Sequence, residues 1–223
     1  MDVLVTGGDT ELGRTVAENF RDDGHRVTLM GAHRDQLELH AKELDVDAIV
    51  CDTTVPANLA EIRGFLPHHL DTIVNVPGPR WETGDSRSYS LTELAGAWRS
   101  AVDATLLSAV LTVQAVGDNL RSGGSIVCVV PDNPRAGSAD AAIKAALSNW
   151  VSGQATAFGT RGITVNAVAS GRSAQPGYEG LTSTPLPVAA EISRLALFLT
   201  TPAARHITGQ TLHVSHGALT QFA

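Results

Sequence analysis

The sequence predicts an α/β protein built on a doubly wound parallel sheet of about seven strands, with helices on both faces. Three observations indicate this fold. Short β-branched runs alternate with longer amphipathic stretches along the chain. The short runs are continuously apolar, as expected of strands covered on both faces. A glycine-rich turn, "TGGDTELG", directly follows the first run. The length of 223 residues suits one domain, 1–223, with a single large core.

The elements follow one another in strict alternation. Residues 2–8 are expected to form a strand followed by the glycine turn, and six further strands are expected at residues 25–30, 47–52, 71–76, 124–130, 162–169 and 210–215. Helices are expected at residues 11–24, 34–44, from Pro56 onward, 91–120, 138–158 and 188–199. Ligands of such sheets bind at the carboxyl ends of the strands. The irregular stretches 76–90 and 170–187 both follow strands, so we expect them at that edge, the second as a short covering segment.

Composition narrows the classes of partner and the compartment. The net charge of −7 and the acidic pI of about 5.5 disfavour nucleic acid and anionic membranes as partners. No charged leader precedes a long apolar region, so we expect a cytoplasmic protein. Cys51 and Cys128 lie in strand-like runs and are expected to be buried, reduced thiols. The histidines show no metal-ligand spacing, and no metal site is expected.

Seven segments, in the expected order, carry a family resemblance. These are "LVTGGDTELG", "CDTT", "IVNVPG", "GSIVCVV", "IKAALSNW", "RGITVNAVASG" and "ITGQTLHVSHGA". The chain resembles the short-chain dehydrogenase/reductase family over essentially its whole length. The resemblance implies a Rossmann-type fold and an NAD(P) site, but the fold alone does not give the function.

The glycine-rich turn is the first part of the expected nucleotide site, and its residues include Gly7, Asp9, Thr10, Leu12 and Gly13. One glycine permits the tight turn, one lets the backbone approach the pyrophosphate, and one lets the helix pack closely. Glu11 occupies the middle glycine position. Its carboxylate either repels the phosphates and weakens binding, or simply acts as a first-turn acid of its helix.

The end of the second strand bears on the choice of dinucleotide. Relatives that prefer NAD place an acid there for the ribose hydroxyls, whereas this chain has none before Asp35. His33 and Arg34 either face a 2′-phosphate or start a solvated helix, so NADP is favoured over NAD if a dinucleotide binds. The resemblance places Asp52 and Thr53 at the adenine.

Further along the chain, Asn75 retains the first asparagine of its family segment, but Val76 and Pro77 replace the residues that usually follow it.

The catalytic positions depart from the family pattern. The resemblance implies a tyrosine, a lysine one helical turn later, a serine and an asparagine. Lys144 keeps the lysine, whereas Asp140, Pro131 and Asp103 occupy the other three positions. Tyrosine has an ordinary pKa near ~10, while aspartate, near ~3.9, is ionised at neutral pH and is a poor proton donor. Asp140 and Lys144 also have the spacing of a simple helical ion pair, and Asp103 is either an interior polar residue or a partner of Asp140.

Two functional hypotheses remain. The first is a non-catalytic or very weakly active family member that keeps a weakened nucleotide site. The second is an NADP-dependent oxidoreductase that uses relocated groups, with Tyr89 and Tyr178 as the chain's two tyrosines.

We also expect a homo-oligomer, a dimer or tetramer, formed through helices 91–120 and 138–158. Their apolar residues cover more than the one stripe needed to pack on the sheet. The alternative is that this surplus is buried between the two helices of one chain.

Overall fold

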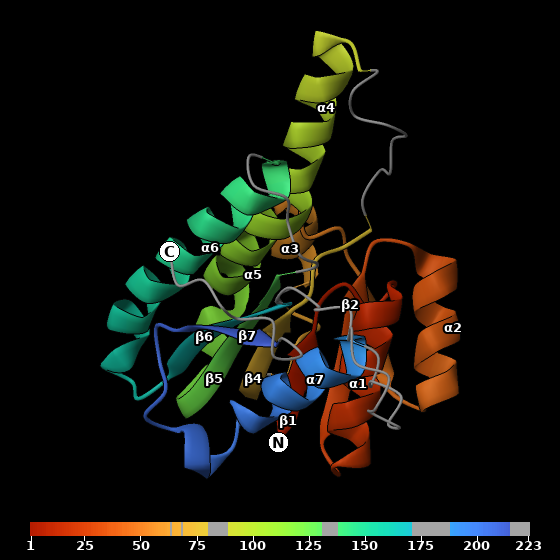
Figure 1. The fold of residues 1–223 in the computed structure, drawn as a ribbon. Helices are drawn as coiled ribbons and strands as arrows, with labels where there is room; N and C mark the ends of the chain where they lie inside the picture. The colour runs from red at the N-terminus through yellow and green to blue at the C-terminus, as the bar shows by residue number, and fades with distance from the viewer. Residues whose placement is uncertain (63, 68, 80–88, 131–137, 171–187, 215–223) are drawn as a thin grey trace, which may run out of the picture.

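The computed structural model describes residues 1–223 except 63, 68, 80–88, 131–137, 171–187 and 215–223. Its centre is a parallel sheet with the strand order β3-β2-β1-β4-β5-β6-β7 (Figure 1). The strands are β1 (Asp2–Val5), β2 (Arg26–Gly31), β3 (Asp47–Val50), β4 (Leu70–Asn75), β5 (Leu120–Val130), β6 (Thr164–Ser170) and β7 (Thr211–Val214). The expected doubly wound α/β fold is therefore confirmed.

The helices fall into two layers, one on each face of the sheet. They are α1 (Glu11–Asp22), α2 (Arg34–Leu44), α3 (Pro56–Ile62), α4 (Leu91–Val102), α5 (Ser108–Val116), α6 (Ala139–Gly159) and α7 (Val188–Phe198). Two short 3₁₀ turns, Gly117–Asn119 and Pro202–Ala204, and a π-helical turn, Asp103–Leu107, complete the described elements.

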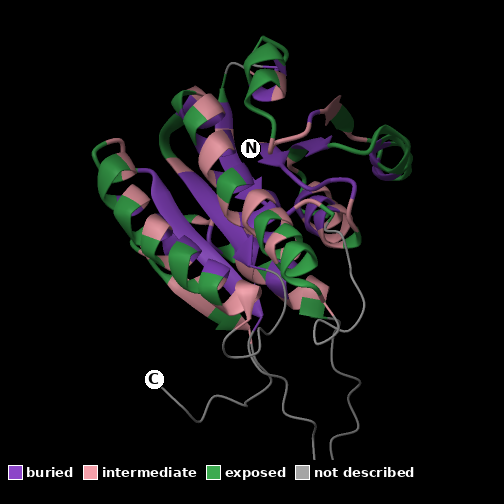
Figure 2. Ribbon diagram, turned by 90° about the horizontal axis from the view of Figure 1, so that it is seen from above, coloured by how far each residue is buried: buried purple, intermediate pink, exposed green. Residues whose placement is uncertain are grey.

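Each layer has its own hydrophobic core. Side chains of α3, α5 and α6 form the first core, and side chains of α1, α2 and α7 form the second. Each strand contributes side chains to both cores, because successive residues of a strand point to opposite faces of the sheet. Leu4 faces the first core while Val3 and Val5 face the second. Figure 2 shows the result, with buried strands enclosed by helices whose outer sides are exposed.

The helix starts follow the local sequence. Thr10 and Ser138 are the N-caps of α1 and α6, and each side chain accepts a hydrogen bond from a backbone N–H of the first turn. At α4, Ser90 and Glu93 form a reciprocal capping box. These caps fix where each helix leaves the carboxyl edge of the sheet.

The order of the strands reverses between β1 and β4. The chain builds β1, β2 and β3 in one direction and then returns to place β4 on the other side of β1. A hydroxyl joins the two strand ends at this point, because Thr6 Oγ1 donates to the Val76 carbonyl at 2.8 Å and accepts from the Val76 N–H at 3.0 Å. Such a reversal opens a crevice at the carboxyl ends of the strands.

The helix expected at 91–120 is divided, and this corrects the sequence analysis. A π-helical turn, Asp103–Leu107, separates α4 from α5, and β5 already begins at Leu120. The Ser108 hydroxyl donates to the Ala104 carbonyl at 2.8 Å within this turn. The described run Leu91–Asn119 is long and apolar enough to cross a membrane by length and composition, but half of its most apolar window is buried inside the protein, as in a core helix.

Candidate functional site

A cavity of about 400 Å³ opens at the carboxyl ends of the strands on either side of the reversal. The residues that line it and that the sequence analysis had selected are Gly7, Asp9, His33, Asp52, Thr53 and Asp103. They come from the loops after β1, β2 and β3 and from the π-helical turn. The sheet topology therefore brings together residues that are as far as about a hundred positions apart in the chain.

Gly7 makes the tight turn after β1. Its φ of +60° lies in the left-handed region, and a Cβ atom there would lie 2.6 Å from the Val76 carbonyl oxygen and 2.7 Å from that of Pro77. Both neighbours are backbone atoms, so they cannot simply move aside. The turn thus places bare backbone at the cavity wall, as a pyrophosphate-binding turn requires.

The other end of the turn is locked by Thr10 and Gly13. The Thr10 hydroxyl donates to the Gly7 carbonyl at 2.7 Å and accepts from the Gly13 N–H at 3.0 Å. A Cβ on Gly13 would overlap the Gly7 carbonyl oxygen, so the first turn of α1 can pack this closely only with glycine. Leu12 packs against the second core from the same turn. The N-terminus of α1 is thereby held next to the cavity, where it favours an anion.

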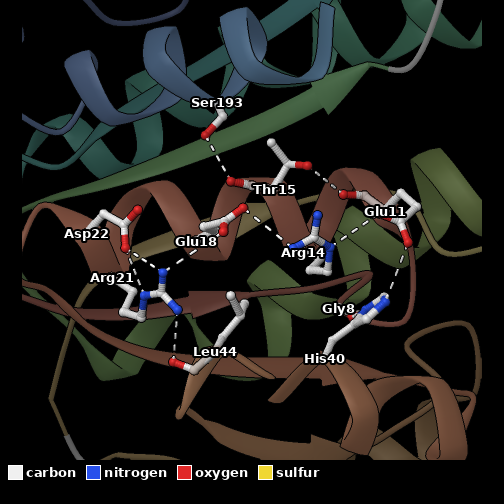
Figure 3. A network of polar contacts seen from close by, with 10 residues as sticks. All are labelled: Gly8, Glu11, Arg14, Thr15, Glu18, Arg21, Asp22, His40, Leu44 and Ser193. Atoms are coloured by element: carbon white, nitrogen blue, oxygen red, sulfur yellow. Dashed lines mark hydrogen bonds and ion pairs between the residues drawn. The ribbon is translucent and has the colours of Figure 1, made fainter. Parts of the chain in front are cut away.

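Glu11 points away from the cavity wall. Its side chain is 79% exposed and lies 3.2 Å from Arg14 Nε and 3.7 Å from His40 Nε2 (Figure 3). Of the two alternatives for this residue, the geometry supports the first-turn acid over a carboxylate aimed at the phosphates.

His40 is a positioning residue that the sequence analysis missed. It is buried on α2, and its Nδ1 lies 2.8 Å from the Gly8 carbonyl oxygen (Figure 3). Because a carbonyl only accepts, Nδ1 carries the proton, and Nε2 is free to accept from the Gln36 amide at 2.6 Å. A histidine on a helix face otherwise formed by Leu37 and Ala41 was the available signal.

Asp9 and His33 form a pair at the end of β2. The carboxylate Oδ2 accepts from the His33 backbone N–H at 2.9 Å and from the His33 Nδ1 at 2.7 Å. The Asp9 side chain is fully buried, whereas that of His33 is 66% exposed. The loop after β1 and the start of α2 are therefore tied together by one carboxylate.

Arg34 lies just outside the cavity, in a neighbouring hollow that Asp9 and His33 also line. Its guanidinium donates to Glu38 at 2.8 Å, one helical turn further along α2. This is the ordinary spacing of an exposed helical ion pair.

On the opposite wall, Asp52 shapes the loop after β3. Its Oδ1 accepts from the Thr54 backbone N–H at 2.9 Å and from the Thr54 hydroxyl at 2.6 Å, so Thr53 is held at the cavity. Cys51 is buried beside it, and burial, followed by the charges of Asp52 and Glu61, raises the pKa of its thiol to about 11.

Asn75 ends β4, below the cavity. Its amide nitrogen donates to Cys128 Sγ at 3.7 Å, while its Oδ1 is buried without a partner. Burial raises the pKa of the Cys128 thiol to about 12. Both cysteines are free and buried, as expected.

The two candidate catalytic residues of α6 lie elsewhere. Asp140 and Lys144 occupy its first two turns and are not among the described residues that line the cavity. Burial lowers the pKa of the Lys144 ammonium. Lys144 in turn lies close enough to His213, on β7, for its charge to lower the pKa of that imidazole, after the larger effect of burial. Pro131 and Tyr178 lie outside the described residues.

Other cavity-lining residues were missed by the sequence analysis, among them Gly31, Gly78, Pro79 and Ser100. Gly31 ends β2, and the signal for it was a glycine directly after an apolar run. Ser100 could have been found from Asp103, because the two are one helical turn apart on the same helix face.

Comparisons with known proteins indicate the family to which the chain belongs. A family model described as enoyl-(acyl carrier protein) reductase matches residues 9–218. A protein of Mycobacterium tuberculosis, named only as a candidate oxidoreductase, is 73% identical over 222 residues and covers 100% of both chains. The 3-oxoacyl-(acyl-carrier-protein) reductase of Staphylococcus aureus is 28% identical, with 96% of each chain covered.

Solved structures share the fold. A short-chain type dehydrogenase/reductase from Mycobacterium ulcerans superposes with a TM-score of 0.79 at 23% identity, covering 97% of this chain and 88% of that one. One from Serratia marcescens gives a TM-score of 0.76 at 24% identity, covering 97% and 96%. With a family model that matches nearly the whole sequence, the chain belongs to the short-chain dehydrogenase/reductase family.

Proposed function

We propose that this protein binds an adenine dinucleotide in the cavity and does not carry out the ordinary carbonyl reduction of its family. One observation carries the binding half of the proposal. The Gly7 turn, the N-terminus of α1 and Asp52 converge on one cavity at the reversal of the strand order.

The residues present fit a dinucleotide. At Gly7 a Cβ atom would meet the carbonyl oxygens of Val76 and Pro77, so only glycine permits the tight turn that brings bare backbone to the cavity. Asp9 keeps a buried carboxylate oxygen without a partner at the ribose side of the cavity. The Gly7 turn would hold the phosphates, and Asp52 and Thr53 would contact the adenine. When bound, the nicotinamide supplies a hydride donor or acceptor.

The chemical half of the proposal rests on α6. Asp140 stands in its first turn and Lys144 follows one turn later, and the family resemblance implies that Asp140 occupies the tyrosine position. An ionised carboxylate has no proton to give to a substrate carbonyl. Removing a general acid typically slows such a reaction roughly 10²–10⁴-fold.

Two measurements on the purified protein test the halves separately. Titration with NADH and NADPH, followed by nicotinamide fluorescence, should show saturable binding of at least one. Turnover with a broad panel of ketones and aldehydes should stay near background. A turnover number in the usual enzyme range that Asp140→Ala abolishes would refute the non-catalytic assignment.

A second function, an oxidoreductase with relocated groups, is favoured by one observation. Lys144 is retained, and His213 lies near it, so a titratable imidazole is present beside the usual lysine. If this function holds, His213→Gln should abolish a turnover that Asp140→Ala leaves intact.

The assembly proposal is independent of the chemistry. Leu91, Leu94 and Trp98 are exposed on α4, and Ala142 and Ala146 are exposed on α6. These surfaces support a dimer or tetramer in which the two helices pair with those of a second copy, in a closed interface.

A further inference from the structure

One oxygen of the Asp9 carboxylate is unexplained by the protein alone. Oδ2 accepts two hydrogen bonds from His33, whereas Oδ1 is buried and has no partner. Leaving a buried charged acceptor unpaired is costly, so native proteins rarely do it without a functional reason. A hydroxyl donor on a ligand would satisfy this oxygen.

The Asp9 carboxylate lies where a side chain on Gly31 would otherwise be. A Cβ atom on Gly31 would lie 2.6 Å from Asp9 Oδ1 and 2.8 Å from Asp9 Cγ. The carboxylate therefore fills the space that a side chain at the end of β2 would take. In dinucleotide sites of this topology, an acid following the second strand accepts from the adenosine ribose hydroxyls of NAD. Here the same space is filled from the loop after β1.

The basic side chains nearby already have partners. The ring of His33 donates to Asp9 at 2.7 Å, and the guanidinium of Arg34 donates to Glu38 at 2.8 Å. A 2′-phosphate would compete with Asp9 and Glu38 for these groups and would bring two phosphate charges next to the Asp9 carboxylate.

We propose that Asp9 is the specificity-determining residue of the dinucleotide site, accepting from the adenosine ribose hydroxyls and excluding a 2′-phosphate. The inference rests on the proposed function, because it requires a dinucleotide in this cavity. The His33 ring, largely exposed, contacts Oδ2 only, which leaves Oδ1 for the ribose hydroxyls. This reverses the expectation drawn from the sequence, in which His33 and Arg34 favoured NADP.

The test compares affinities for NADH and NADPH by calorimetric titration, so it does not depend on turnover. The wild-type protein should bind NADH at least about tenfold more tightly than NADPH. Asp9→Asn, which keeps the size of the side chain but removes its charge, should bring the ratio close to one. Glu11→Gln is the matched control, since it removes one charge from the same loop at an exposed position and should leave the ratio unchanged.

A swap variant tests the position as well as the charge. Asp9→Ala should lose the preference, and Asp9→Ala combined with Gly31→Asp should restore it by supplying the carboxylate from β2. Equal affinities in the wild type, or tighter binding of NADPH, would overturn the role of Asp9 while leaving the proposed function intact. Binding of neither dinucleotide would instead refute the proposed function and this inference together. If Asp9→Asn does not fold, the wild-type ratio and the swap variant still decide.

Discussion

Replacing Gly7 with alanine tests whether the turn after β1 is as tightly packed as its geometry indicates. The new Cβ would lie 2.6 Å from the Val76 carbonyl oxygen, and the residue would remain at a φ of +60°. The left-handed conformation costs an L-residue roughly 1–2 kcal/mol. Forcing a methyl group against fixed neighbours costs about 1–3 kcal/mol more. We expect Gly7→Ala to lower the free energy of unfolding by about 3 kcal/mol.

Gly24→Ala is the matched control. Gly24 also has a positive φ, +82°, but a Cβ there would meet no heavy atom of the described chain within 4 Å. Both variants share the conformational cost and the small gain from a stiffer unfolded chain. The difference between them, expected to be about 1–3 kcal/mol, isolates the steric contact.

Urea unfolding followed by circular dichroism measures both variants. The midpoint should fall further for Gly7→Ala than for Gly24→Ala, with the slope unchanged, since only then does the midpoint report stability. Dinucleotide affinity should also fall for Gly7→Ala alone. Equal midpoints for the two variants would mean that the turn can relax. The close approach of the Gly7 turn to the backbone after β4 would then not require glycine.

Three further outcomes are expected. Cys51 and Cys128 should not react with a thiol reagent at pH 8 in the native protein, because their raised pKa values, about 11 and about 12, leave at most about one thiolate in a thousand. Two thiols should react after the protein is unfolded in denaturant. Rapid labelling of the native protein would contradict this prediction. Glu11→Gln should change dinucleotide affinity less than about fivefold in titration, since the carboxylate is exposed, and a large gain would restore the repulsion hypothesis. Light scattering after size exclusion should give a dimer or tetramer mass, and a monomer would end the assembly proposal.

The fold could be predicted because it depends on local patterns. The continuous apolar runs gave all seven strands, and α2 was expected with the bounds that it has, Arg34–Leu44. The Gly7 turn was also predictable, because few residues other than glycine permit a left-handed turn so close to a neighbouring backbone segment. The π-helical turn was not, since Asp103–Leu107 has the same helical periodicity as its neighbours and differs only in hydrogen bonding.

The directions in which individual side chains point could not be predicted from the sequence. Glu11 and Asp9 lie two positions apart in one loop, yet one is exposed and the other fully buried. The difference arises from His33, which is distant in the sequence and donates twice to Asp9. The bond between His40 and Gly8 depends in the same way on how α2 packs beside the turn.

The proposed dinucleotide-binding turn and the two candidate catalytic residues lie in different layers of this fold, and this separation bears on the proposed function. The Gly7 turn is locked by α1, which packs with α2 in the second core, whereas Lys144 and Asp140 belong to α6, which packs in the first. Thr10 forms hydrogen bonds with Gly7 and Gly13, and Asp9 forms hydrogen bonds with His33. Under the proposed function, an aspartate at the tyrosine position would remove a proton donor without disturbing the Gly7 turn, which would hold the phosphates. A protein that binds a dinucleotide without reducing carbonyls is consistent with this arrangement, whereas loss of the Gly7 turn would remove both abilities, because chemistry on a nicotinamide requires the dinucleotide to be held first.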